Sequence, residues 1–103
     1  MRRRRYRLSE RAADDLTDIY DYIAKTNPKA AQRVVNAIQV KIRSIAALGL
    51  TGTPKDDMKS DLRAAVFRNH LIYFRVTASH LLILRILHGR QDITSENFPE
   101  SEI

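Results

Sequence analysis

Cysteine is absent from this chain of 103 residues. Its absence excludes a disulfide framework, a thiolate nucleophile and a zinc site built on cysteine, and gives no indication of an oxidising compartment. A long apolar run is also missing. The longest apolar cluster, 81–87, is interrupted by Arg85, whereas a membrane span needs about 18 consecutive apolar residues. The sequence therefore predicts no membrane-spanning segment.

Histidine is scarce and dispersed. His70 and His80 each begin a predicted strand and His88 ends one, so no two histidines stand at the helical spacing of a metal-binding pair. We expect structural roles for them, no metal site and no cofactor.

Positive charge is abundant. The chain carries 18 Lys and Arg against 12 Asp and Glu, a formal charge of +6, and 13 of those cations are Arg. Arginine makes forked contacts with carboxylates and phosphates, so we expect an acidic partner. Arginines also fill positions 2–5, but no apolar run of signal-peptide length follows them. We expect a cytoplasmic protein that forms one domain over residues 1–103.

The first half of the chain predicts a strand followed by two helices. Residues 5–8 alternate between polar and apolar side chains, as in a short edge strand. Ser9 is a suitable N-cap for a helix that ends near Lys25. Asn27 followed by Pro28 begins a second helix, which the residues Leu48-Gly49 end. These helices form an αα-hairpin, and the Asp residues on the outer side of the first helix are interpreted as a solvated face.

The second half predicts a long surface loop, 50–61, and three consecutive strands, 62–67, 70–76 and 80–87. The loop is either functional or a simple connector. The expected fold is α+β: an N-terminal strand, the αα-hairpin and a three-stranded antiparallel meander, with both helices on one face of the sheet.

Arginines recur along these strands at Arg63, Arg75 and Arg85, where a β-strand has no structural need of a cation. Side chains alternate with period two along a strand. We therefore expect Tyr73, Arg75, Ile83 and Arg85 to line the face away from the helices. This partly apolar, cationic face needs a cover, unless its arginines pair with aspartates of the loop.

The order of these elements resembles the ParE/RelE superfamily of bacterial toxins. The resemblance spans nearly the whole chain, from Tyr6-Arg7-Leu8-Ser9 at the start of the first helix onward. It also rests on Asp-Ile-Tyr-Asp-Tyr-Ile at 18–23, Leu48-Gly49, Leu62-Arg63, Ile-Tyr-Phe-Arg-Val at 72–76, and Ile-Leu-Arg-Ile-Leu-His-Gly-Arg-Gln-Asp at 83–92. The resemblance implies a toxin that a cognate antitoxin neutralises in a hetero-oligomer, by wrapping it with an acidic, amphipathic C-terminal segment.

The superfamily divides by target. RelE-like members cut mRNA on the ribosome with basic residues and often a C-terminal tyrosine. Here Arg63 lies near one basic position of those ribonucleases, but Leu71 takes the place of a strand arginine, and Asn97 and Phe98 stand where the tyrosine is expected. His88 and Arg90 are an alternative base and phosphate clamp, although Gly89 beside them favours a structural turn at the end of the strand.

ParE-like members are similar to this chain in the ending 87–92, and that resemblance implies inhibition of DNA gyrase without chemistry by the toxin. This is the function that we predict. The candidate contact residues for antitoxin or target are Arg63, Tyr73, Arg75, Arg85 and Arg90. A basic nucleic-acid-binding module is a further alternative, although the sequence has no recognition-helix signature.

Overall fold

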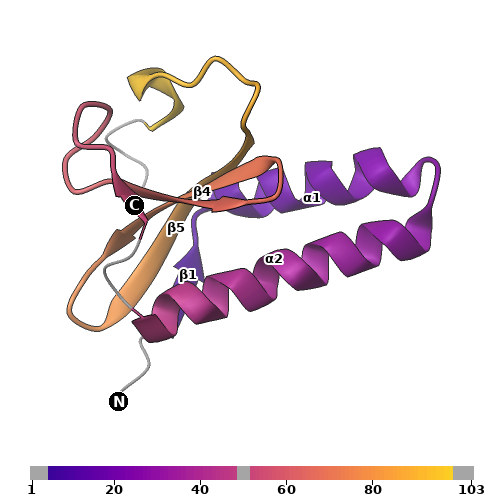
Figure 1. The fold of residues 1–103 in the computed structure, drawn as a ribbon, viewed down its shortest axis with the longest axis horizontal. Coiled ribbons are helices and arrows are strands. Elements are labelled where there is room, and N and C mark those ends of the chain that lie inside the picture. Colours follow the sequence, from indigo (N-terminus) through magenta and orange to yellow (C-terminus); the bar gives the residue numbers. More distant parts are fainter. Residues whose placement is uncertain (1–4, 49–51, 99–103) are drawn as a thin grey trace.

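The computed structural model describes residues 5–48 and 52–98, which form the α+β fold shown in Figure 1. The elements in chain order are β1 (Arg5–Leu8), α1 (Glu10–Ala24), α2 (Pro28–Leu48), β2 (Thr53–Pro54), β3 (Arg63–Phe67), β4 (His70–Val76), β5 (His80–His88) and a short 3₁₀ helix, η1 (Ser95–Asn97). The predicted α+β class is confirmed. Of the helices in the described ranges, none combines the length and the apolar character needed to span a membrane.

The strands form one sheet in the order β1-β5-β4-β3-β2. β1 runs parallel to β5, so the first and last strands are neighbours, while the other neighbouring pairs are antiparallel. The predicted edge position of 5–8 and the interior position of the last long strand are confirmed. The prediction that 50–61 is entirely loop is wrong at β2, which pairs with Arg63 and Ala64. A strand of two residues is too short to show alternation.

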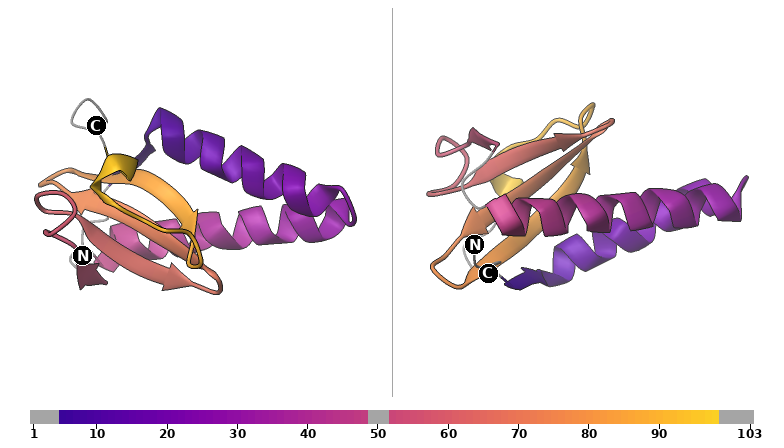
Figure 2. Two further views of the ribbon diagram at one scale, coloured as in Figure 1. Left: turned by 90° about the horizontal axis from the view of Figure 1, so that it is seen from above. Right: turned by 60° about the horizontal axis from the view of Figure 1, so that its bottom comes forward.

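Local capping determines where the helices begin. The Ser9 hydroxyl accepts a hydrogen bond from the Ala12 amide at 3.0 Å, and the Asn27 side chain accepts one from the Ala30 amide at 3.0 Å. Both bonds satisfy amides that the first helical turn leaves without a partner. The expected stop at Gly49 lies outside the described residues. The hairpin packs on one side of the sheet, and its tip extends beyond the sheet (Figures 1 and 2).

The main core lies between the hairpin and the sheet. Its buried members come from both helices and from the three long strands, so neither layer can be removed without exposing it. They are Ala12, Leu16, Ile38, Ile42, Ile45, Ala46, Ala65, Ile72, Phe74, Leu81, Ile83 and Ile86.

A second, smaller core lies on the opposite face of the sheet. The C-terminal segment folds back over this face, and the rings of Phe98 and Tyr73 lie 4.9 Å apart. The Lys59 ammonium donates a hydrogen bond to the Phe98 carbonyl at 3.3 Å, which also holds the C-terminal segment in place. Tyr73 is consequently only 1% exposed. The prediction that Tyr73 lies on an open face is wrong, because the chain covers that position itself.

Truncating the main core on α2 tests this arrangement. Ile38 is 0% exposed, whereas Val40, two residues further along the same helix, is 56% exposed. Ile38→Ala should lower the free energy of unfolding by about 2–5 kcal/mol, through lost burial and the cavity left behind. Val40→Ala is the matched control and should change it by less than about 0.5 kcal/mol in urea denaturation. Equal effects would contradict the assigned helix face.

Candidate functional site

The strand arginines do not share one face of the sheet. Arg63 stands directly opposite Phe74, and cross-strand partners share a face, so Arg63 lies on the helix side. Arg75 alternates with Phe74 and lies on the other side. Ile83 belongs to the main core. The prediction of one face carrying Tyr73, Arg75, Ile83 and Arg85 is therefore wrong. The contact roles suggested for the arginines remain predictions.

An irregularity in β5 explains the difference. Tyr73 pairs with Arg85 and Phe74 pairs with Ile83, which leaves Leu84 as an extra residue in β5. Such a bulge changes the phase of alternation along its strand. Uniform alternation assigns Ile83 and Arg85 to the same face, but the bulge separates them.

Arg85 is held by α1. Its Nε and Nη2 atoms donate to the two carboxylate oxygens of Asp15 at 2.8 and 2.9 Å, and the Ile86 amide donates to the same carboxylate at 2.9 Å. Nη1 of Arg85 reaches the Asn97 carbonyl at 3.4 Å. Only 15% of the Arg85 side chain and 11% of the Asp15 side chain are exposed. This fork joins a helix, the bulged strand and the C-terminal segment, so its first role is structural.

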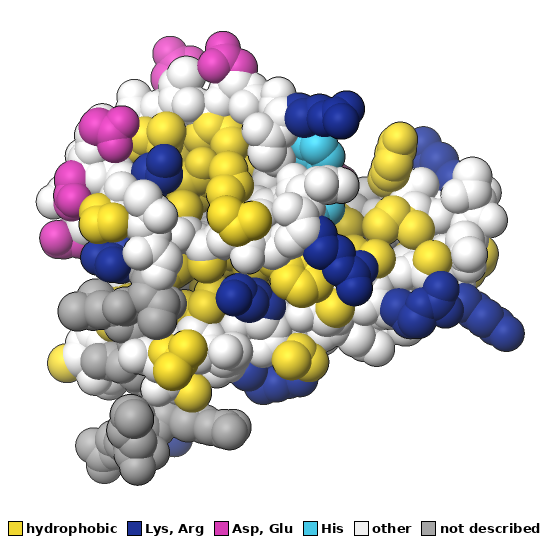
Figure 3. Space-filling model, viewed as in Figure 1, with side chains coloured by type: hydrophobic (Ala, Val, Ile, Leu, Met, Phe, Trp, Pro, Cys, Tyr) yellow, Lys and Arg dark blue, Asp and Glu magenta, His cyan; other side chains and the backbone are white. Residues whose placement is uncertain are grey.

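Arg63 lies in mixed electrostatic surroundings. It donates to the Gly52 carbonyl at 3.3 Å and lines a surface pocket together with Asp56 and Asp61. Figure 3 shows acidic side chains gathered along the upper and left margin of this view, with Lys and Arg beside them and over the rest of the surface. The Arg63 pocket is thus less suited to an anion than its arginine alone suggests.

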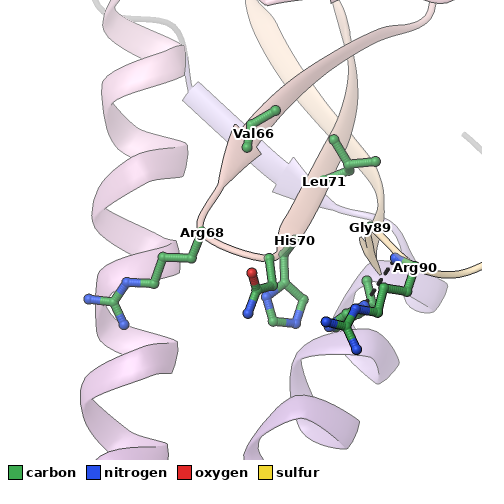
Figure 4. A pocket seen from close by; sticks show the side chains of 8 residues that line it. Val66, Arg68, His70, Leu71, Gly89 and Arg90 are labelled. Atoms are coloured by element: carbon green, nitrogen blue, oxygen red, sulfur yellow. Dashed lines mark hydrogen bonds between the residues drawn. The ribbon is translucent and has the colours of Figure 1, made fainter.

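A second pocket, which we call the turn pocket, lies at the β3–β4 turn and the end of β5. Its volume is about 260 Å³, and it is lined by Val66, Arg68, Asn69, His70, Leu71, His88, Gly89 and Arg90. Figure 4 shows Arg68 and Arg90 on either side of His70, with Val66 and Leu71 on the adjoining strands. None of these lining residues is acidic. Arg90 is the one predicted contact residue that the structure brings here.

The polar groups of the turn pocket are organised by backbone hydrogen bonds. The Gly89 amide donates to the Asn69 carbonyl at 2.8 Å, and the Arg90 amide donates to Nδ1 of His88 at 3.1 Å. The expected turn after β5 is confirmed. His88 Nδ1 is the acceptor in this hydrogen bond, so the neutral ring carries its hydrogen on Nε2.

His70 and His88 are in ring contact, with their centroids 5.4 Å apart in an edge-on arrangement. Burial, and secondarily the charge that His88 can carry, lower the pKa of His70. Burial also raises the pKa of Tyr73, with a smaller contribution from Asp57. Within the described ranges, no group of three or more His, Asp or Glu residues is arranged to hold a metal ion.

Sequence reasoning missed Asp15, Val66 and Arg68. Asp15 looked like its solvated neighbours, since a single helix position gives no sign that it meets an arginine 70 residues later. For Arg68 and Val66 the sequence contains a weak indication of surface exposure. Arg68 begins the two-residue link between predicted strands, and such links expose their side chains.

The chain is similar to known proteins in both sequence and structure. Residues 6–93 match the family described as "ParE toxin of type II toxin-antitoxin system, parDE". Toxin ParE1 of Caulobacter vibrioides is 31% identical over 84 residues, which cover 81% of this chain and 86% of that protein. A solved structure titled "Chromosomal ParDE TA system from P. aeruginosa" superposes with a TM-score of 0.71 at 26% identity, covering 82% of this chain and 95% of the other.

The helical hairpin on a sheet whose first and last strands are parallel neighbours is thus the fold of ParE/RelE superfamily toxins. The chain belongs to the ParE toxin family of type II toxin-antitoxin systems.

The contribution of Asp15 to stability can be tested by comparing its substitution with that of the adjacent residue, Asp14. Asp15→Ala leaves the Arg85 guanidinium and the Ile86 amide without their acceptor and should lower the free energy of unfolding by about 3 kcal/mol. Asp14→Ala removes an exposed carboxylate from the same helix and should change it by less than about 0.5 kcal/mol. Urea denaturation of both variants measures the difference, and a similar small loss in both would contradict the structural role of Asp15.

The histidine contact predicts a pH dependence of stability. The pKa of His70 is lowered from 6.5 in the folded chain, so the unfolded chain takes up this proton first as the pH falls. Stability should therefore be fully present above pH 6.5 and decline as the pH drops from 6.5 to the lowered value. His70→Asn should reduce this decline in urea midpoints measured at neutral and mildly acidic pH. An unchanged pH dependence in the variant would show that His70 does not contribute.

Proposed function

We propose that this chain is a toxin that inhibits DNA gyrase by binding it, without catalysing a reaction. The observation that carries the proposal is the match of residues 6–93 to the ParE family. The protein acts in the bacterial cytoplasm as one domain, and its free form slows growth. Its gene and that of its antitoxin would stabilise a plasmid or chromosomal region that carries them.

The positions at which the chain departs from the ribonuclease pattern support a binding role. Phe98 stands where those enzymes often have a tyrosine, and it is buried against Tyr73 instead of facing solvent. Leu71 stands at the place of a strand arginine and contributes an apolar side chain to the turn pocket. Loss of a transition-state cation or a proton-transfer group typically costs about a hundredfold or more in rate.

A ribosome-dependent mRNA endoribonuclease is the second candidate, because His88 and Arg90 lie together in the turn pocket beside Arg68. In that reaction a histidine would take the proton of the 2′-hydroxyl and the arginines would hold the phosphate. Nδ1 of His88 already accepts a hydrogen bond from the Arg90 amide. The neutral ring then carries its hydrogen on Nε2, so neither nitrogen is free to take the proton of the 2′-hydroxyl. Arg63 lies in a different pocket, which weakens this candidate.

The partner in the resting cell is a cognate antitoxin, and toxin and antitoxin form a hetero-oligomer. The formal charge of +6 favours an acidic antitoxin segment, since opposite charge accelerates association and apolar anchors slow dissociation. Arg75 and Arg90 remain the candidate contact arginines for this segment. Tyr73 and Arg85 would act indirectly, through the surfaces that they support.

Parallel assays of both targets test the proposed function. Purified wild-type protein should block supercoiling by gyrase or trap cleaved DNA, while leaving ribosome-bound mRNA intact. His88→Ala should retain the gyrase effect, because no catalytic base is involved. The product of a small reading frame beside the toxin gene should relieve the inhibition when added in equal amount.

The second candidate predicts the opposite result: cleavage of mRNA at the ribosomal A site, loss of cleavage in His88→Ala, and no effect on gyrase. His80→Ala is a suitable control, because His80 lies at the other end of β5 and outside the turn pocket.

A further inference from the structure

One edge of the sheet is incompletely paired. β2 lies beside β3 only at Ala64 and Arg63, through Thr53 and Pro54. In the part of the chain that the structure describes, no strand lies beyond the remaining residues of β3, 65–67. Unpaired strand edges invite the addition of another strand. The outer side of 65–67 is therefore a candidate binding edge.

Val66 is the residue of this edge whose backbone groups face the free side. The two-residue turn between β3 and β4 closes on the pair Phe67 and His70, and backbone hydrogen bonds alternate from one antiparallel pair to the next. The amide and carbonyl of Val66 therefore point away from β4, toward the free side. Its side chain is 66% exposed, one of the large apolar side chains most open to solvent in the described residues.

Val66 also connects the free edge to the turn pocket. It stands opposite Leu71 on β4, and both side chains line the pocket. Arg68 and Arg90 supply positive charge to the same pocket, and no lining residue is acidic. Apolar contact, positive charge and unpaired backbone groups thus occur within one short stretch of surface.

The backbone at Arg68 is strained, with φ at 55°. Glycine or asparagine adopts this left-handed conformation with less strain than arginine does. The Arg68 guanidinium carbon lies 5.1 Å from the centre of the Phe67 ring, so the side chain is held along the edge strand. The sequence therefore keeps an arginine at a backbone position that favours another residue, and strain of this kind is common at functional sites.

We propose that an extended acidic segment of a partner protein adds as a strand to β3 at Val66, inserts an apolar side chain against Val66 and Leu71, and directs carboxylates to Arg68 and Arg90. This inference rests on the proposed antitoxin and gives that partner a specific attachment site. Strand addition supplies affinity through backbone hydrogen bonds, and alternate side chains supply specificity. A nucleic acid fits the surface less well, because a phosphate backbone makes no use of the apolar side chains or of an unpaired strand edge.

A labelled short peptide of alternating glutamate and valine is the probe. It should bind the wild-type protein, and binding should protect the Val66 amide from hydrogen exchange. A lysine-valine peptide and a glutamate-serine peptide should bind at least about tenfold more weakly, since one lacks the charge and the other lacks the apolar anchor.

Two substitutions test the site on the protein. Val66→Asp should weaken binding of the glutamate-valine peptide by about tenfold or more, with Val40→Asp as the exposed control on α2. Arg68→Gly should weaken binding while raising the melting temperature, because glycine relieves the backbone strain. The second variant separates lost binding from lost folding.

The proposal is overturned if the control variant weakens binding as much as Val66→Asp, if Val66 exchange is unaffected by the peptide, or if a short DNA duplex binds more tightly than the peptide and is insensitive to Val66→Asp. The gyrase assay is independent of these results. Unchanged neutralisation of Val66→Asp by the antitoxin would refute the site and leave the proposed toxin activity intact. Peptide binding without gyrase inhibition would support the site and refute that activity.

Discussion

The contact between Asp15 and the bulged part of β5 is the constraint on which the rest of the structure depends. Asp15 accepts hydrogen bonds from Arg85 and from the Ile86 amide. Six residues earlier, the Ser9 amide donates to the Ile83 carbonyl at 2.9 Å and the Ser9 hydroxyl donates to the Leu84 carbonyl at 2.8 Å. These bonds fix α1 along β5 at the irregular step, where regular pairing leaves backbone groups to be satisfied.

The same junction determines how the C-terminal segment lies. Arg85 reaches the Asn97 carbonyl, and Lys59 reaches the Phe98 carbonyl, so cations from two parts of the chain hold adjacent carbonyls over the second core. Phe98 then covers Tyr73. The segment thus covers the middle of this face, while Val66, where we propose that a partner binds, stays 66% exposed.

One fold can serve unrelated activities, so the site and not the fold must decide the function. In this chain the two residues that depart from the nuclease pattern have apolar structural surroundings: Phe98 lies in the second core and Leu71 packs at its margin. The turn pocket retains positive charge but pairs it with apolar side chains. That combination is typical of protein recognition.

The sequence by itself determined the two long helices and the longer strands, because capping residues and periodicity are local: Ser9 and Asn27 mark the helix starts, and β4 has the predicted bounds, His70–Val76. The formal charge of +6 is a sum over the chain, so the sequence alone also predicts an acidic partner. Only the tertiary structure decided which arginines are available. The fork joins Asp15 to Arg85 across 70 positions, and the bulge in β5 is set by the pairing of that strand with β4. No local pattern encodes either contact.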